Sequence, residues 1–373
     1  MTEPATSLDS LVPLPVQPDG VPWPTDAWPT ADPPAAVTGR LAALLDDITT
    51  ETARYGTTYA VAVVQGGALL AERYGGVLEH WDRPHEPVGA TTRLLSWSMA
   101  KSVLHAAVGI LVGDSRLAPD APAPVAEWTD DANPADPRRA ITLDHLLTMR
   151  DGLDFAEDYE DFERSDVIRM LFGDAQPDMA HFAAGHPLAH PPGTVFNYSS
   201  GTSVIVSGIV ARTVGPGAGY ERFLRERLFE PIGMRSAHAR FDGAGTFVGS
   251  SFLDATAQDY LRFGLLYLRD GVWDGRRLLP EGWVDHGRRA RSFDAEGDRW
   301  HGAHWWAVGD ALGTFIANGY EGQSLLICPP LDLLVLRLGK SAEEHHDPNL
   351  RAWRRRMVEA FASPASAGGR LGS

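Results

Sequence analysis

Lysine is rare in this chain, and one lysine follows a serine at a spacing that suits acyl chemistry. Of the 33 basic residues, only Lys101 and Lys340 are lysines. Arginine stays protonated in proteins, whereas a lysine amine can lose its proton when it is desolvated. Ser98 lies three residues before Lys101 and forms the chain's single S-x-x-K motif. This spacing predicts a serine nucleophile with a lysine that helps to take its proton.

The segment after the serine reads as a buried helix. Residues 99–113 are apolar on nearly all sides, so Lys101 is expected to be buried with them. Positions three apart share a helix face, which places Lys101 beside Ser98, and a helix N-terminus favours developing negative charge. A second interpretation stays open, in which Ser98 caps the helix and Lys101 extends along apolar surface to water.

Two further segments carry groups that would complete such a site. Tyr198 precedes a helix rich in valine and isoleucine, where a phenol beside an amine can take part in acid–base catalysis. Taken alone, Tyr198 fits a packed aromatic residue better. Residues 317–323 lie between two predicted strands, and their glycines allow backbone N–H groups to form an oxyanion hole. A plain hairpin turn is the alternative for that segment.

Other kinds of catalytic site find less support. The sequence contains neither a G-x-S-x-G nucleophile elbow nor an H-E-x-x-H zinc motif. The pair His301 and His304 and the pair His345 and His346 are weak candidates for metal ligands. We therefore expect no metal and no cofactor.

Acidic and aromatic residues also gather near these motifs. The acidic residues between Glu157 and Glu163 are interpreted as a solvated surface around the site entrance. Trp305 and Trp306 are adjacent, so one is expected to face the core and the other the pocket.

The composition is that of an ordinary globular protein, with 44% hydrophobic and 22% charged residues. The net charge of -16 disfavours nucleic acid and anionic membranes as partners. The single cysteine, Cys328, excludes an intrachain disulfide. The longest apolar run, residues 103–112, is about half of a membrane span. No secretory signal is recognised, so a cytoplasmic location is expected, and association into a homodimer is left open.

Strand signals gather at the two ends of the chain. Residues 59–64 and 68–73 read as a hairpin, and three further strands are expected at 312–317, 324–328 and 333–338. Helices are predicted at 36–54, 143–149, 161–172, 200–214, 219–228, 256–268 and 349–362. The fold class is therefore α/β (α+β): an antiparallel five-stranded sheet from both chain ends, flanked by helices, with a mainly helical inserted region.

The domain division follows from these elements. Residues 36–110 and 255–362 are assigned to an α/β sheet domain, and residues 111–254 to a mainly helical inserted domain. Residues 1–35 hold nine of the 27 prolines and form an extension that either wraps over the body or is disordered. Residues 363–373 are expected to be a flexible tail.

Taken together and in this order, the motifs resemble the serine hydrolases of the β-lactamase-like fold. That superfamily includes class C β-lactamases, penicillin-binding D,D-peptidases, related esterases and 6-aminohexanoate-oligomer hydrolases. The resemblance is strongest to the last group and covers about residues 55 to 340. The matching stretches are residues 94–102, 157–159, 196–200, 305–306 and 319–323.

The resemblance implies a role for each matching residue. Ser98 would attack the acyl carbon, while Lys101 and Tyr198 would share its proton and pass one to the leaving group. The backbone N–H groups of Ser98 and Tyr320 would hold the oxyanion. Contacts to the substrate are implied for Tyr159, Ser200, Trp306, Gly319 and Gly322.

Two departures from β-lactamases bear on the substrate. Ser200 stands where they have asparagine, and Ala317 begins the segment where they have Lys-Thr-Gly. Alanine cannot hold the carboxylate of a β-lactam or of a D-alanine terminus, so the resemblance implies a small ester or linear amide as substrate. Two alternatives remain. One is β-lactamase or D,D-peptidase activity, and the other is a pseudoenzyme, against which the presence of Ser98, Lys101 and Tyr198 argues.

Overall fold

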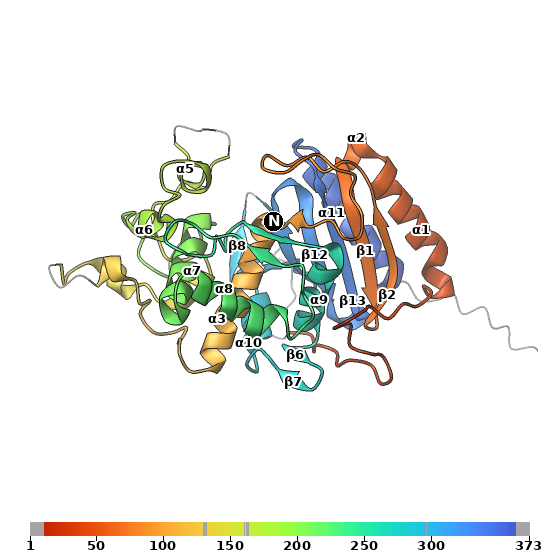
Figure 1. Ribbon diagram of the computed structural model, residues 1–373, viewed down its shortest axis with the longest axis horizontal. Helices are drawn as coiled ribbons and strands as arrows, with labels where there is room; N and C mark the ends of the chain where they lie inside the picture. The colour runs from red at the N-terminus through yellow and green to blue at the C-terminus, as the bar shows by residue number, and fades with distance from the viewer. Residues whose placement is uncertain (1–10, 130–132, 160, 162–163, 296, 363–373) are drawn as a thin grey trace, which may run out of the picture.

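Both ends of the chain pair in one antiparallel sheet (Figure 1). The computed structural model describes residues 11–129, 133–159, 161, 164–295 and 297–362. The strands, in sheet order, are β2 (Ala68–Tyr74), β1 (Thr57–Gln65), β13 (Leu333–Lys340), β12 (Gln323–Cys328), β11 (Phe315–Gly319), β10 (Trp306–Ala307), β9 (Arg299–His301) and β8 (Ser292–Asp294). The sheet thereby joins residues that are far apart in the sequence.

Helices cover both faces of this sheet. Val61 and Val63 of β1 face α1 (Ala35–Thr50) and α11 (His346–Ala362). Ala62 of the same strand belongs to the core on the opposite face, which is covered by α3 (Ala100–Gly113) and α9 (Ala257–Leu268). Because both faces are buried, the central strands contain long apolar runs, which explains their clear sequence signal.

The helical region lies beside α3 (Figure 1). The remaining helices are α2 (Thr52–Tyr55), α4 (Leu143–Leu147), α5 (Asp166–Phe172), α6 (Met179–Ala184), α7 (Ser200–Val214), α8 (Ala218–Leu224) and α10 (Trp283–Arg288). The remaining strands are β3 (Leu94–Leu95), β4 (His238–Ala239), β5 (Leu253–Ala255), β6 (Val272–Trp273) and β7 (Arg276–Arg277). Packing of α3 against α7 joins the helical region to the sheet.

The predicted fold class is confirmed, and the sheet is three strands wider than the five that were expected. The five predicted strands correspond to β1, β2, β11, β12 and β13. The additional strands β8, β9 and β10 are two or three residues long and carry polar residues such as Asp294 and Arg299. Strands this short are not long enough to show an alternation of apolar and polar residues, so they cannot be predicted from the sequence.

Several predicted boundaries shift for local reasons. The helix predicted at 200–214 is α7. The helix predicted from residue 161 begins at Asp166, because the Ser165 hydroxyl accepts the Ile168 N–H and caps it. The predicted domain boundary between residues 110 and 111 falls inside α3, which continues to Gly113. The division into two domains stays a prediction.

The described part of the N-terminal extension, residues 11–34, wraps over the body. The Trp28 indole is buried and donates to the Gln258 carbonyl at 3.1 Å. Trp23 packs against Trp273 with 5.1 Å between ring centroids. Residues 1–10 and the predicted tail, 363–373, lie outside the described residues.

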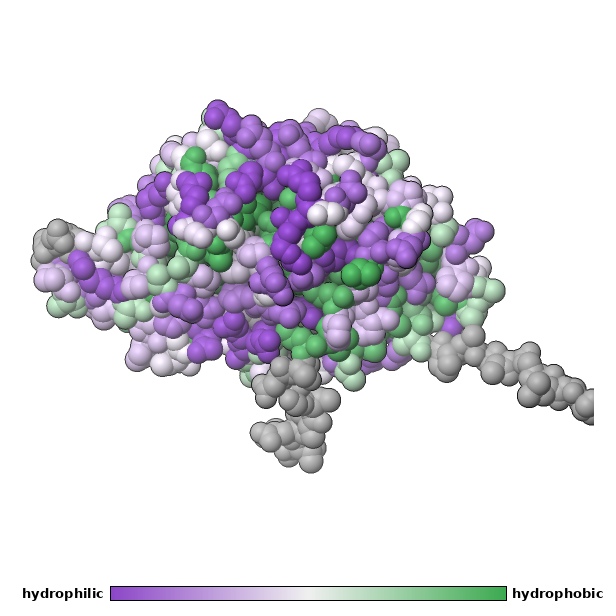
Figure 2. Space-filling view, turned by 90° about the horizontal axis from the view of Figure 1, so that it is seen from below, coloured by the Kyte–Doolittle hydropathy of each residue, from purple (hydrophilic) through white to green (hydrophobic). Residues whose placement is uncertain are grey.

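The face of the molecule shown in Figure 2 is mainly polar. Figure 2 shows polar side chains over most of the face seen from below, with apolar residues gathered in smaller patches near its middle. Within the described part of the chain, every helix is too short or too polar to span a membrane.

One buried carboxylate fixes the loop in front of α7. The Asp151 side chain accepts the Leu153 N–H and the Thr202 hydroxyl, each at 2.8 Å. Asp151 is only 3% exposed. Burial raises the pKa of its carboxyl from 3.8 to about 6, although both hydrogen bonds oppose the shift.

This carboxylate should make stability depend on pH. The folded pKa exceeds the unfolded pKa, so the contribution to stability is present below pH 3.8 and is lost as pH rises through about 6. We expect the unfolding free energy of the wild type, relative to Asp151→Asn, to fall by about 2.5 kcal/mol between pH 4 and pH 7. Urea unfolding of both proteins across this range measures the difference. A difference that stays constant with pH would contradict the assignment.

Candidate active site

Ser98 stands between the short strand β3 and helix α3. The preceding segment is anchored, because the Ser96 N–H donates to the Leu253 carbonyl at 2.8 Å. Trp97 then adopts a left-handed φ of 45°, which turns the chain toward α3. For an L-residue this conformation costs about 1–2 kcal/mol, so the surrounding packing must hold it. Met99, and not Ser98, occupies the cap position of α3.

The amine of Lys101 lies inside the protein and is surrounded by oxygen atoms. Lys101 is 2% exposed. Its Nζ is 3.0 Å from Ser98 Oγ, 3.1 Å from Ser200 Oγ and 2.9 Å from the Ser250 carbonyl oxygen. The expected proximity of Lys101 to Ser98 is therefore present, and the amine does not extend to water.

Tyr198 faces this amine with its ring. Lys101 Nζ lies 4.8 Å from the ring centroid. The backbone after Tyr198 is fixed by Ser199, whose hydroxyl accepts the Thr202 N–H at 3.0 Å and caps α7. Trp306 stacks against Tyr198 at 5.3 Å, with the planes tilted by 31°. Tyr198 thus packs between Lys101 and Trp306, and it is partly exposed.

The two adjacent tryptophans are both buried and have different neighbours, and the contact of Trp306 with a pocket stays a prediction. Trp305 is fully buried against Tyr267 and Phe315 in the core. Trp306 lies beside Tyr198, and the Arg299 guanidinium covers its ring at 3.8 Å.

Glu157 belongs to the site, so its interpretation as solvated surface is wrong. Its carboxylate accepts the Ser200 N–H at 2.7 Å and the Ser200 hydroxyl at 2.6 Å. It also accepts the Tyr159 hydroxyl at 2.6 Å. Tyr159 is 41% exposed overall, but desolvation of its hydroxyl end and the adjacent carboxylate raise the pKa of the phenol well above its usual range. The neighbouring Glu160 and Glu163 lie outside the described residues.

The end of β11 comes close to the serine-bearing segment. A Cβ on Gly319 would lie 2.3 Å from the Ser96 carbonyl oxygen, so only glycine fits there. The next residue, Tyr320, sets its ring edge-on to Trp97 at 5.5 Å. Tyr159 stacks on Tyr320 at 5.4 Å and 15°. Tyr320 therefore lies beside the segment around Ser96, between Trp97 and Tyr159.

Gly322 has a packing role in this turn. It adopts a φ of 82°, and an added Cβ would meet the Leu350 and Arg337 side chains at 2.5 and 2.7 Å. Gly322 thus shapes the turn from the side of α11, whereas the other predicted contact residues gather around Lys101 and Tyr320.

The histidines near Lys101 are neutral. Burial first, and then the charge of Arg299, lowers the pKa of His301 to about 3. Burial also lowers the pKa of His304 well below its usual value, and His304 Nδ1 contacts the Lys101 carbonyl at 3.1 Å. Among the described residues, no group of three acidic, histidine or cysteine side chains is arranged to hold a metal ion.

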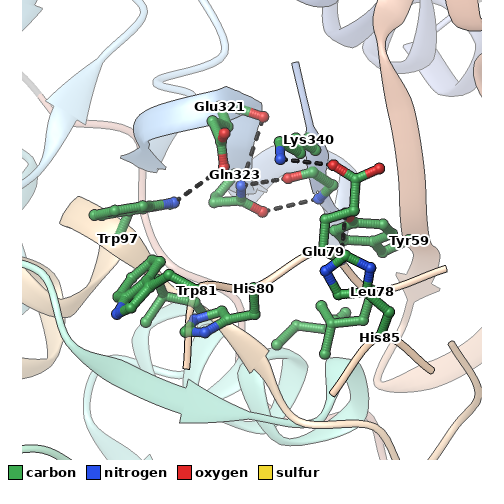
Figure 3. A pocket seen from close by; sticks show the side chains of 13 residues that line it. Tyr59, Leu78, Glu79, His80, Trp81, His85, Trp97, Glu321, Gln323 and Lys340 are labelled. Atoms are coloured by element: carbon green, nitrogen blue, oxygen red, sulfur yellow. Dashed lines mark hydrogen bonds and ion pairs between the residues drawn. The ribbon is translucent and has the colours of Figure 1, made fainter. Parts of the chain in front are cut away.

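A cavity of about 410 Å³ lies next to the site, behind Trp97 (Figure 3). The Trp97 indole points to the Glu321 carboxylate at 3.4 Å, and Lys340 pairs with Glu79 at 2.7 Å on another wall. Burial raises the pKa of Glu321. The other lining residues are Tyr59, Leu78, His80, Trp81, His85, Leu94, Leu95, Gln323 and Gly339.

The arrangement brings three of the sequence-predicted residues together. The Ser98 hydroxyl lies beside the Lys101 amine, and the face of the Tyr198 ring lies 4.8 Å from the same amine. Sequence reasoning missed Ser250, which binds the amine through its backbone carbonyl, and the involvement of Glu157. Any residue type can supply a backbone carbonyl, so the sequence offered no signal for Ser250. Glu157, in contrast, lies inside the matching stretch 157–159 and could have been assigned to the site.

Known proteins of similar sequence and structure were then compared with the chain. The family model described as Beta-lactamase matches residues 41–359. The 6-aminohexanoate-dimer hydrolase of Paenarthrobacter ureafaciens is 27% identical over 314 residues, covering 79% of this chain and 75% of the relative.

Solved structures show the same fold. A protein from Bacillus anthracis, provisionally described as a 6-aminohexanoate-dimer hydrolase, superposes with a TM-score of 0.69 at 20% identity, covering 94% of this chain and 90% of that one. A penicillin-binding protein homologue from Caulobacter crescentus gives 0.67 at 17% identity, with coverages of 89% and 99%. The family model spans most of the sequence, and the chain therefore belongs to the beta-lactamase family of serine hydrolases.

Proposed function

We propose that this protein hydrolyses carboxylic esters or linear amides through an acyl-enzyme on Ser98. The observation that carries the proposal is the buried Lys101 amine, 3.0 Å from Ser98 Oγ. A buried lysine needs its polar atoms satisfied, and here one of the three oxygen atoms around the amine belongs to the hydroxyl that would be the nucleophile. Membership of a hydrolase family supports the same reading.

Acylation would use the groups in order. Ser98 Oγ attacks the acyl carbon as its proton passes to the pair formed by Lys101 and Tyr198. The carbonyl oxygen becomes an oxyanion, held by the backbone N–H groups of Ser98 and Tyr320. Cleavage of the C–O or C–N bond then releases the alcohol or amine, which takes a proton from Tyr198.

Deacylation repeats these steps with water. The water attacks the acyl carbon of the ester on Ser98 and gives a proton to Lys101 and Tyr198. When the intermediate collapses, Ser98 Oγ leaves and recovers that proton, and the carboxylic acid is released. The catalytic groups return to their starting protonation states, so no other co-reactant is needed.

The substrate class is inferred from the strand beside the nucleophile. Ala317, on β11, stands where β-lactamases carry a lysine, and it is buried. A substrate carboxylate brought to this position would lose a charge-assisted hydrogen bond. The relative from Paenarthrobacter ureafaciens acts, by its name, on a 6-aminohexanoate dimer, which supports linear amides as candidate substrates.

Ser98→Ala should abolish ester hydrolysis and labelling by a fluorophosphonate, because both need the same hydroxyl. Activity toward p-nitrophenyl butyrate and gel fluorescence after labelling measure the two effects. Ser292→Ala, on β8, is a matched control that should keep both. Labelling that persists in Ser98→Ala would show that another serine is the nucleophile.

Lys101→Arg should lower kcat by at least about a hundredfold, because a guanidinium stays protonated and cannot act as a base. Steady-state kinetics on the ester measure the loss, and circular dichroism checks the fold. Lys340→Arg makes the same exchange at an exposed ion pair with Glu79 and should leave kcat unchanged. Near-full activity of Lys101→Arg would limit Lys101 to a structural role.

A substrate panel should separate esters and amides from β-lactams. The missing lysine removes a hydrogen bond worth about 1.5–3 kcal/mol, or roughly one to two decades in rate or affinity. We expect hydrolysis of short-chain p-nitrophenyl esters, and negligible turnover of penicillins and a chromogenic cephalosporin. Linear 6-aminohexanoate amides form the third arm of the panel. A kcat/KM for the cephalosporin above that for the best ester would overturn the substrate assignment.

A further inference from the structure

The Glu157 carboxylate determines which way one hydroxyl beside Lys101 donates its hydrogen bond. An ionised carboxylate is only an acceptor, so Ser200 Oγ must donate its proton across the 2.6 Å contact to Glu157. The short Ser200 N–H contact of 2.7 Å to the same carboxylate keeps the two residues together. Ser200 Oγ therefore has only lone pairs to offer to Lys101.

This direction constrains the amine in turn. A neutral lysine amine has two N–H bonds and one lone pair. The Ser250 carbonyl, at 2.9 Å, accepts one N–H, and Ser200 Oγ, at 3.1 Å, accepts the other. The third neighbour, 3.0 Å away, is Ser98 Oγ. The remaining lone pair of Lys101 thus points at the Ser98 hydroxyl and can accept its proton.

We propose that Glu157 is a positioning residue that acts through Ser200 to direct the lone pair of Lys101 at Ser98. The proposal rests on the proposed function, because it assumes that Lys101 takes the proton of Ser98. Without the carboxylate, the Ser200 hydroxyl is free to rotate and donate to the amine. Lys101 would then donate an N–H to Ser98 and would lose its role as a base.

Few charged groups oppose this arrangement. The titratable groups that face Lys101 are Tyr198, in front of α7, and His301 and His304, which precede β10. Both histidines are neutral because burial lowers their pKa values.

The same carboxylate is also linked to Tyr320 through Tyr159. Tyr159 donates to Glu157 at 2.6 Å and stacks on Tyr320, whose backbone N–H is proposed to hold the oxyanion. Replacement of Glu157 therefore changes the support of Tyr159 as well. Tyr159→Phe, which removes only this hydroxyl, measures that part of the effect separately.

Glu157→Gln is the first test, because the amide keeps the shape and presents a donor on one side. We expect kcat on p-nitrophenyl butyrate to fall roughly 10- to 100-fold, because only part of the acid–base catalysis by Lys101 would be lost. KM should change less than twofold. Asp154→Asn makes a similar change at an exposed position of the same loop and should alter neither quantity.

A double-mutant cycle with Ser200→Ala tests whether Glu157 acts through Ser200. The double variant should have the same kcat as Ser200→Ala alone. If the two residues acted independently, their separate losses in kcat would multiply. If Glu157→Gln does not fold, Glu157→Ala with added formate replaces it, and formate should restore at least a tenfold loss.

The outcomes separate this proposal from the proposed function. Wild-type kcat in Glu157→Gln, multiplying effects in the cycle, or no response to formate would overturn the positioning role. In each case fluorophosphonate labelling of Ser98 would leave the proposed function intact. Absence of that labelling in the wild type would overturn the proposed function itself.

Discussion

The burial of one amine among oxygen acceptors is the constraint on which the site depends. An ammonium or amine removed from water costs several kcal/mol unless hydrogen bonds replace its hydration. Lys101 meets this requirement with Ser98, Ser200 and the Ser250 carbonyl, which come from three separate segments. The lysine can therefore be buried only where α3, α7 and the segment before β5 meet, and this meeting point defines the candidate site.

The rest of the fold holds these segments at that distance. The antiparallel sheet joins the two ends of the chain. Its strand β11 ends next to the turn that bears Ser98, where the missing side chain of Gly319 permits close approach to the Ser96 carbonyl. Trp97 and Glu321 both adopt left-handed backbone conformations on either side of this contact. Tyr159 reaches over from the helical region to stack on Tyr320. The site thus lies where the sheet and the helical region meet.

The sequence predicted the parts of this structure that depend on local pattern. The helix at 200–214, the strands with continuous apolar runs and the pairing of Ser98 with Lys101 all arise from neighbours in the chain. Long-range partners could not be predicted from local pattern, and Tyr198, Ser200 and Tyr320 were assigned only through the family resemblance. Ser250 is 149 residues from Lys101, and Glu157 is 43 residues from Ser200. Glu157 was read as surface because a carboxylate in a charged run is usually solvated, and only the fold brings it to α7.

The central claim is that a covalent acyl group forms on Ser98 during turnover. Acid quenching within milliseconds of mixing with a p-nitrophenyl ester, followed by intact-protein and peptide mass spectrometry, tests it most directly. The account predicts a mass increase equal to the acyl group, located on the peptide that contains Ser98. Turnover without such an adduct, even in Tyr198→Phe with slowed proton transfer, or an adduct on another residue would contradict it.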